Sequence, residues 1–171
     1  MKRHLIITLF MFFIVGFAFS QNADTSTVVQ LGQIAPDFKV ETLDGRTVQI
    51  SDLKGRVVLL NFFATWCGPC KEELPELQKT ILPKFRGMDY VQLSIGREHT
   101  REELVAFRKE KKLTIPMAPD PERKIYSLFA KIYIPRNIVI GKDGKIAYLD
   151  MGFTEEKSKA LIRAIENQLK M

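Results

Sequence analysis

The chain has 171 residues, with 26 lysines and arginines against 20 aspartates and glutamates, and a formal net charge of +6. Two of the basic residues, Lys2 and Arg3, precede an apolar N-terminal run, so residues 21–171 carry 26 − 2 = 24 basic and 20 acidic side chains, a net charge of +4. This excess is mild, and no basic face with interleaved aromatic residues is visible, which speaks against a nucleic-acid-binding protein.

The N-terminal segment has the pattern of a secretory signal peptide. Two cationic residues are followed by Leu5–Phe19 without a charge, and Ala18 to Ser20 form a small-x-small cleavage pattern. The run is shorter than the roughly 20 apolar residues that span a bilayer. We therefore predict a signal peptide over residues 1–20, with an uncleaved membrane anchor as the alternative. The remaining chain is expected in the periplasm or another extracytoplasmic space, where disulfides persist, either free or tethered to the membrane.

A polar segment follows, and we expect residues 21–33 to form a flexible lead-in to a single domain over residues 34–171. The domain should open with a β-hairpin. Alternating apolar positions in residues 38–40 and 47–50 flank the pair Asp44-Gly45, which is typical of a tight hairpin turn.

The middle of the chain alternates strands and helices. The almost wholly apolar run Val57–Ala64 predicts a central strand buried on both faces, and a helix should begin near Cys67. Residues 90–95 predict a second strand, after which Thr100 and Glu103 form a capping box that opens another helix. This order predicts a core of parallel strands.

The C-terminal part should add an antiparallel pair and a closing helix. Asp120 precedes a proline and is expected to cap a short helix. Residues 132–140 predict a strand with Pro135 at its head, and residues 146–149 predict its antiparallel partner. An amphipathic helix over residues 154–169 completes the domain.

The only two cysteines, Cys67 and Cys70, stand two residues apart where the predicted central strand gives way to a helix. The unpaired N–H groups and positive dipole end of a helix favour a thiolate at its start, and the thiolate is the nucleophile. Pro69 fits the first helical turn, because its missing N–H costs no hydrogen bond there. Cys70 would attack a mixed disulfide and release the substrate. The pair therefore predicts thiol-disulfide exchange.

A zinc site and a static disulfide are the alternatives for this pair. Zinc usually takes four ligands, and besides the cysteines the chain offers only His4 and His99, the second of which we expect in a solvated loop. A disulfide across a two-residue spacer restricts the unfolded chain little, so it would stabilise the fold little. The sequence predicts no metal site and no cofactor.

Five short motifs give the chain a family resemblance. They are Ala-Pro-Asp-Phe at 35–38, the segment Asn61–Cys70, Glu-Leu-Pro at 73–75, Tyr-Ile-Pro at 133–135 and Lys-Asp-Gly at 142–144. With them the chain resembles the exported thioredoxin-like proteins of the TlpA and ResA type, in the redoxin or AhpC/TSA-like superfamily. The resemblance implies an α/β protein of thioredoxin-like fold, with a central mixed β-sheet flanked by helices and an N-terminal β-hairpin extension.

The resemblance assigns Cys67 as the attacking thiol and Cys70 as the resolving thiol. Glu73 matches an acidic residue that ResA-type proteins carry shortly after the second cysteine, and it would take the proton from Cys70. The alternative is that Glu73 has no catalytic role and stands there because the helix dipole favours an acidic residue in the first turns. Asn61 stands where cytoplasmic thioredoxins have a buried Asp, so the role of the buried acid would pass to Glu73.

Five further residues are expected to contact the substrate. Pro135 matches the cis-proline that faces the disulfide in thioredoxin-like folds, and the backbone of Ile134 would pair with an extended substrate segment. A trans-proline that starts a strand is the alternative. Trp66 would add contact area beside the sulfurs, or serve only in packing. Gly68 and Pro69, between the cysteines, complete this set.

These features together predict an exported thiol-disulfide oxidoreductase that reduces protein disulfides. The Gly68-Pro69 pair resembles that of reducing thioredoxins, whose potential is about −270 mV. The expected partners are disulfide-bonded substrate proteins and a membrane electron transporter, and the family suggests cytochrome c maturation; we expect a monomer. The alternatives are a thiol peroxidase, where Ala64 replaces the threonine that positions peroxide, and a non-catalytic binding module of thioredoxin fold.

Overall fold

The structure, a computed structural model, describes residues 25–171, so the predicted signal peptide lies outside the described residues. Within residues 25–171 no helix combines the length and the apolar character that a membrane crossing requires.

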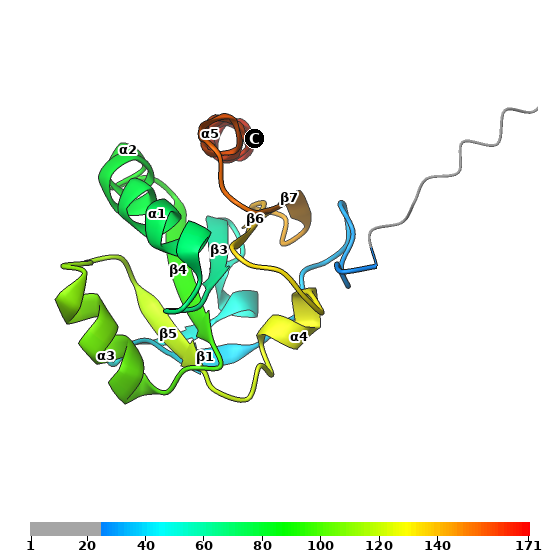
Figure 1. Cartoon of the computed structure of the whole chain (residues 1–171). Coiled ribbons are helices and arrows are strands. Elements are labelled where there is room, and N and C mark those ends of the chain that lie inside the picture. The colour runs from blue at the N-terminus through cyan, green and yellow to red at the C-terminus, as the bar shows by residue number, and fades with distance from the viewer. Residues whose placement is uncertain (1–24) are drawn as a thin grey trace, which may run out of the picture.

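A five-stranded mixed sheet forms the centre of the domain, in the spatial order β5-β4-β3-β6-β7 (Figure 1). Its strands are β3 (Val57–Phe63), β4 (Tyr90–Arg97), β5 (Met117–Asp120), β6 (Arg136–Ile140) and β7 (Ile146–Met151). The strands β3, β4 and β5 run parallel, whereas β6 pairs antiparallel with both β3 and β7. Every residue of β3 is buried, as expected for a central strand covered on both faces. The predicted mixed sheet is confirmed.

The predicted N-terminal hairpin is also present. It consists of β1 (Lys39–Glu41) and β2 (Thr47–Gln49), which pair antiparallel, and it leads into a short 3-10 helix, η1 (Ile50–Leu53). Gly45 in the turn has a φ of 76°, a left-handed conformation that glycine adopts without steric cost.

Helices cover the two faces of the sheet unequally. They are α1 (Gly68–Glu76), the π-helix η2 (Leu77–Ile81), α2 (Leu82–Lys84), α3 (Arg101–Glu110), α4 (Tyr126–Phe129) and α5 (Glu155–Lys170). Residues of α1, η2, α3 and α5 share one apolar cluster with one face of β3, and α4 packs with the hairpin on the other face. The predicted capping box of α3 is confirmed, with Thr100 and Glu103 each accepting the backbone N–H of the other.

Two expectations for the C-terminal half are corrected. Residues 117–120 form β5, which the sequence analysis did not predict, and Asp120 is its last residue rather than the first cap of a helix. Asp120 still serves α4, because its carboxylate accepts the backbone N–H groups of Ile125 and Tyr126 at 3.1 and 2.8 Å. The strand expected from residue 132 begins only at Arg136, since residues 132–135 form a loop.

Arg136 ties the start of β6 to the described part of the lead-in. Its buried guanidinium donates hydrogen bonds to Thr27 Oγ1 at 2.7 Å and Ser26 Oγ at 3.0 Å, and to the carbonyl of Ile132 at 3.0 Å. The N–H of Val28 donates to the α4 carbonyl of Phe129. Residues 26–28 are thereby attached to α4 and to the start of β6, while the domain boundary at residue 34 stays a prediction.

Candidate active site

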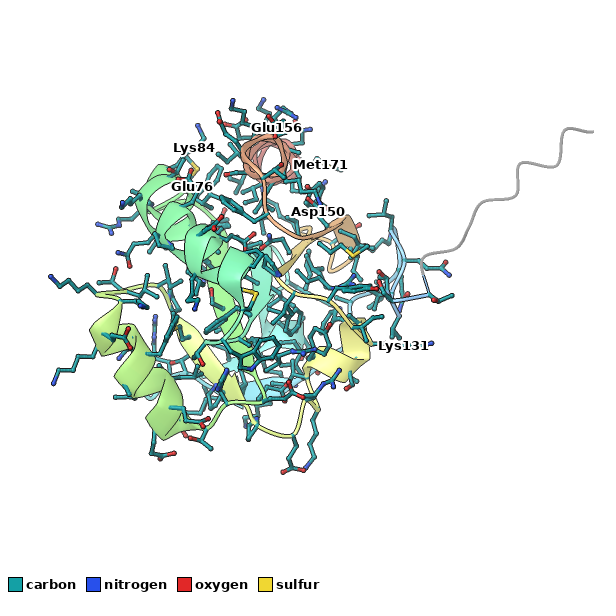
Figure 2. The ribbon with its side chains drawn as sticks, in the orientation of Figure 1. Glu76, Lys84, Lys131, Asp150, Glu156 and Met171 are labelled. Carbon is teal, nitrogen blue, oxygen red and sulfur yellow. A yellow bond between two sulfur atoms is a disulfide. The ribbon has the colours of Figure 1, made fainter. Side chains whose placement is uncertain are left out.

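The two cysteines lie where β3 passes into α1. Cys67 is the N-cap residue of α1, and its Sγ accepts the backbone N–H of Cys70 at 3.3 Å. The sulfurs form a disulfide with a Cα–Cα distance of 5.3 Å, seen in Figure 2 as a yellow bond at the N-terminal end of α1. Cys67 is 6% exposed and Cys70 is fully buried. An incoming thiolate or disulfide therefore reaches Cys67 first, and the helix end favours negative charge on that sulfur.

The loop before β6 faces the disulfide. The Ile134-Pro135 peptide bond is cis, and the carbonyl oxygen of Ile134 lies 3.8 Å from Cys67 Sγ. Tyr126 of α4 holds this loop, because its hydroxyl donates to the carbonyl of Tyr133 at 2.9 Å. A substrate segment that crosses the disulfide would meet this backbone. The contact of Ile134 and Pro135 with substrate remains a prediction.

The surface around Cys67 is open and partly aromatic. Trp66 is 60% exposed, and the guanidinium of Arg97 lies 5.4 Å from the centre of its ring, a cation–π arrangement that orients the indole. Gly68 and Pro69 are exposed, and a Cβ atom added to Gly68 would have no neighbour within 4 Å. These three residues leave open the approach to Cys67, the more exposed of the two cysteines, which is consistent with their predicted role in substrate contact.

Glu73 lies in a cage of side-chain amides. It follows Cys70 by three residues in α1, and it is only 2% exposed. Asn61 Nδ2 donates to Glu73 Oε2 at 2.7 Å, and Asn137 Nδ2 donates to Glu73 Oε1 at 2.5 Å. The two asparagines are paired across β3 and β6, and Asn61 Nδ2 also donates to Asn137 Oδ1 at 3.0 Å. The sheet register therefore builds the cage.

Burial raises the pKa of Glu73 from 4.5 to about 7, although the N–H donors of Asn137 and Asn61 act in the opposite direction. The carboxylate of Asp150 raises the pKa further and the ammonium of Lys157 lowers it. Asp150 and Lys157 form an ion pair of 3.1 Å beside the site. The carboxyl of Glu73 can therefore both accept and release a proton near neutral pH, which is what its predicted role as proton acceptor for Cys70 requires.

This shifted pKa has a measurable consequence for stability. Between pH 4.5 and about 7 the folded protein holds a proton on Glu73 that the unfolded chain has lost, so this group's stabilisation is complete below 4.5 and is lost as the pH rises through about 7. As the pH rises from 4.5 to about 7, we expect the free energy of unfolding of the oxidised wild type to fall by up to about 3 kcal/mol relative to that of the Glu73→Gln variant.

Urea unfolding at a series of pH values measures this difference. Glu72→Gln, a change of the exposed carboxylate next in the helix, is the matched control and should follow the wild type. A constant difference between the wild type and Glu73→Gln from pH 4 to 8 would show that Glu73 titrates normally.

His99 does not lie in a solvated loop, as was expected from the sequence. It is 6% exposed rather than solvated, and its Nε2 accepts the backbone N–H of Thr65 at 2.9 Å. Its other ring nitrogen, Nδ1, lies 3.3 Å from the carboxylate of Glu103. His99 thus braces the turn between β3 and Cys67. Its position after β4, which is the parallel neighbour of β3, is the only signal in the sequence that points to this contact.

Comparisons with known proteins agree with this geometry. The sequence profile of the AhpC/TSA family matches residues 31–149. The thiol-disulfide oxidoreductase ResA of a Bacillus cereus strain is 32% identical over 163 residues, which cover 94% of this chain and 93% of the relative.

Two solved structures extend the comparison. A solution structure provisionally assigned as a protein disulfide isomerase of Bacteroides thetaiotaomicron superposes with a TM-score of 0.81 at 35% identity, over 86% of this chain and 94% of that one. A crystal structure provisionally assigned as the thiol:disulfide interchange protein DsbE of Chlorobium tepidum gives a TM-score of 0.72 at 26% identity, over 82% of this chain and 99% of that one.

Proposed function

This chain belongs to the AhpC/TSA family and is a thiol-disulfide oxidoreductase, and on that premise we propose that it works outside the cytoplasm as a reductant of protein disulfides. Glu73, buried one helical turn after the buried Cys70 in α1, is the observation that supports this direction of the reaction. A strongly oxidising pair owes its potential to a stabilised reduced form. A carboxylate in a low-dielectric site opposes a second negative charge nearby, and so it disfavours a thiolate at Cys70 in the reduced pair.

The proposed reaction begins with the reduced pair. The Cys67 thiolate attacks one sulfur of a substrate disulfide, and the second substrate sulfur leaves as a thiolate that takes up a proton. Glu73, in its ionised form, accepts the proton of the Cys70 thiol. The Cys70 thiolate then attacks Cys67 Sγ, which forms the disulfide of the structure and releases the first substrate sulfur. Two electrons pass to the substrate, which leaves as a dithiol.

The Gly68-Pro69 pair supports the same direction, because it resembles the spacer of thioredoxins with potentials of about −270 mV rather than that of strong oxidants at about −120 mV. Equilibration of the full-length protein with dithiothreitol and glutathione redox buffers tests the proposal. We expect a reduction potential below about −220 mV for the Cys67–Cys70 pair. A potential above about −150 mV would identify an oxidant or isomerase and overturn the proposal.

The proposed setting follows from the predicted export of the chain. A reductant in an oxidising compartment needs a continuous supply of electrons. We propose a membrane thiol-disulfide transporter as the donor and disulfide-bonded proteins, among them apocytochromes c, as substrates. Trapping with Cys70→Ser in intact cells tests this part, because the variant keeps Cys67 and lacks the resolving thiol. The absence of any cytochrome precursor from the trapped proteins would remove that substrate class.

A further inference from the structure

A pocket of about 470 Å³ opens at the end of the sheet opposite the disulfide. Its walls come from the start of β4, from the hairpin of β1 and β2, and from the connection between α2 and β4. The strand β3 separates it from the active site, since Arg56 before the strand lines the pocket and Cys67 follows the strand's other end. Seven residues of extended chain span roughly 20 Å. We call this site the β4-edge pocket.

One buried polar group in the β4-edge pocket has no partner. Gln92 is 3% exposed and lines the pocket. Its Oε1 accepts the hydroxyl of Tyr90 at 3.1 Å, whereas its Nε2 has no hydrogen-bond acceptor in residues 25–171. A buried donor without an acceptor destabilises the fold. A ligand that brings an acceptor into the pocket would satisfy this donor once the Gln92 side chain turns toward it.

The pocket also exposes the edge of a strand. The pairing of β4 with β5 begins at Ser94, so no strand covers the other edge of Tyr90 to Leu93 within the described part of the chain. The Ser94 N–H donates to the carbonyl of Pro116 at 2.9 Å, and alternation along a strand directs the backbone groups of Gln92 toward this same edge. Pro116 has no N–H and cannot continue the ladder. The carbonyl of Tyr90 on this edge already accepts Arg56 Nη2 at 2.9 Å, so the backbone groups of Gln92 are the ones left for pairing with an extended segment.

Three arginines give the pocket its charge. Arg46, Arg56 and Arg86 line it, and none of them forms an ion pair with a carboxylate among residues 25–171. Two arginines of the neighbouring helix α3 behave differently, because Arg101 pairs with Glu41 and Arg108 pairs with Asp44, each at 2.8 Å. The walls between the arginines are apolar and aromatic. These walls include Leu82, Phe85, Met88, Tyr90 and Leu93.

We propose that the β4-edge pocket binds an extended acidic segment of another protein, which adds as a short strand to the free edge of β4. The segment's backbone would pair with that of Gln92, and one of its carbonyl oxygens would accept from Gln92 Nε2. Its carboxylates would meet the three arginines, and its apolar side chains would contact the aromatic wall. A small anion would satisfy the arginines but would leave the strand edge unused, so a peptide accounts for more of the observations.

Titration of the ¹⁵N-labelled, oxidised full-length protein with a synthetic peptide tests this proposal. The probe is the acetylated hexapeptide Thr-Val-Glu-Val-Glu-Phe with a free C-terminus, and its control has glutamine for glutamate and an amidated C-terminus. We expect the acidic peptide to shift the backbone amide signals of residues 90–93 and to bind at least about tenfold more tightly than the neutral one. Signals around Cys67 should not move.

Two triple variants separate charge from folding. Replacing Arg46, Arg56 and Arg86 by Gln should weaken binding at least about tenfold, and replacing them by Lys should preserve most of it. Both variants should reduce insulin at the wild-type rate, because these residues lie outside the disulfide site. Equal binding of the two peptides, shifts confined to the disulfide end, or unchanged binding by the Gln variant would each overturn the proposal. None of these results depends on the direction of electron transfer at Cys67.

Discussion

Replacing Cys67 by Ser is expected to lower the rate of insulin reduction by at least about a thousandfold, because a hydroxyl is not ionised near neutral pH and cannot replace the thiolate as nucleophile. The fold should survive, since Cys67 is an N-cap residue and serine is among the best residues at that position. The variant should also form no mixed disulfide with substrate. Turbidity of insulin with dithiothreitol as the electron source measures the rate.

Cys70→Ser should behave differently and so provides the control. It retains Cys67, the proposed attacking residue, but lacks the buried sulfur of Cys70, proposed to resolve the complex, so it should accumulate a covalent complex with a protein disulfide. Non-reducing electrophoresis would detect this complex. If Cys67→Ser formed the complex and Cys70→Ser did not, the order of attack assigned to the two cysteines would have to be reversed.

The elements that surround the cysteines could be predicted because their signals are local. The run Val57–Phe63 is apolar throughout except for Asn61, and the pair Thr100 and Glu103 caps α3 within four residues of sequence. Both patterns reflect interactions between near neighbours in the chain or burial on both faces. The strand β5 has no comparable pattern, since its sequence Met-Ala-Pro-Asp is short and contains a proline. Its position at the sheet edge comes from pairing with β4.

The residues of the site also fall into two groups, those with a local signal in the sequence and those that only the sheet register brings together. The positions of Cys67 and Cys70 at a helix start follow from their spacing and from the strand before them. The cage around Glu73 does not, because Asn61 and Asn137 are 76 residues apart and meet only through the antiparallel register of β3 and β6. A shift of that register by one residue would turn Asn137 to the other face of the sheet. His99 contacts Thr65 for a similar reason, through the parallel register of β3 and β4.

The register also explains why an asparagine suffices at position 61. A side chain there points toward the same space as Glu73, and a carboxylate in that place would put two negative charges in one buried site. The amide of Asn61 instead donates a hydrogen bond to Glu73. This bond partly offsets the cost of burying the Glu73 carboxylate. The chain thus holds a single buried acid in this cage, and the side chains of Asn61 and Asn137 link it from α1 to the sheet through hydrogen bonds.

Glu73→Gln is expected to slow the attack of Cys70 on the mixed disulfide by about a hundredfold at pH 7 or above, because loss of a general base costs typically 10²–10⁴-fold. In the wild type this step should accelerate as the pH rises toward about 7 and then level off, since only the ionised form of Glu73 accepts a proton. The variant should lose that rise. Stopped-flow measurement of the step at each pH, with a preformed mixed disulfide at Cys67, gives both quantities.

Glu72→Gln separates this role from a general effect of charge on α1, because its carboxylate is exposed in the same helical turn. It should retain the wild-type rate and the rise toward pH 7. A variant at Glu73 that is slower at every pH by the same factor, with the rise intact, would mean that Glu73 only positions Cys70. The pH profile therefore distinguishes a general base from a positioning residue. Loss of a positioning residue lowers the rate at every pH, whereas loss of the general base also removes the rise of the rate with pH that comes from titration of the buried carboxyl.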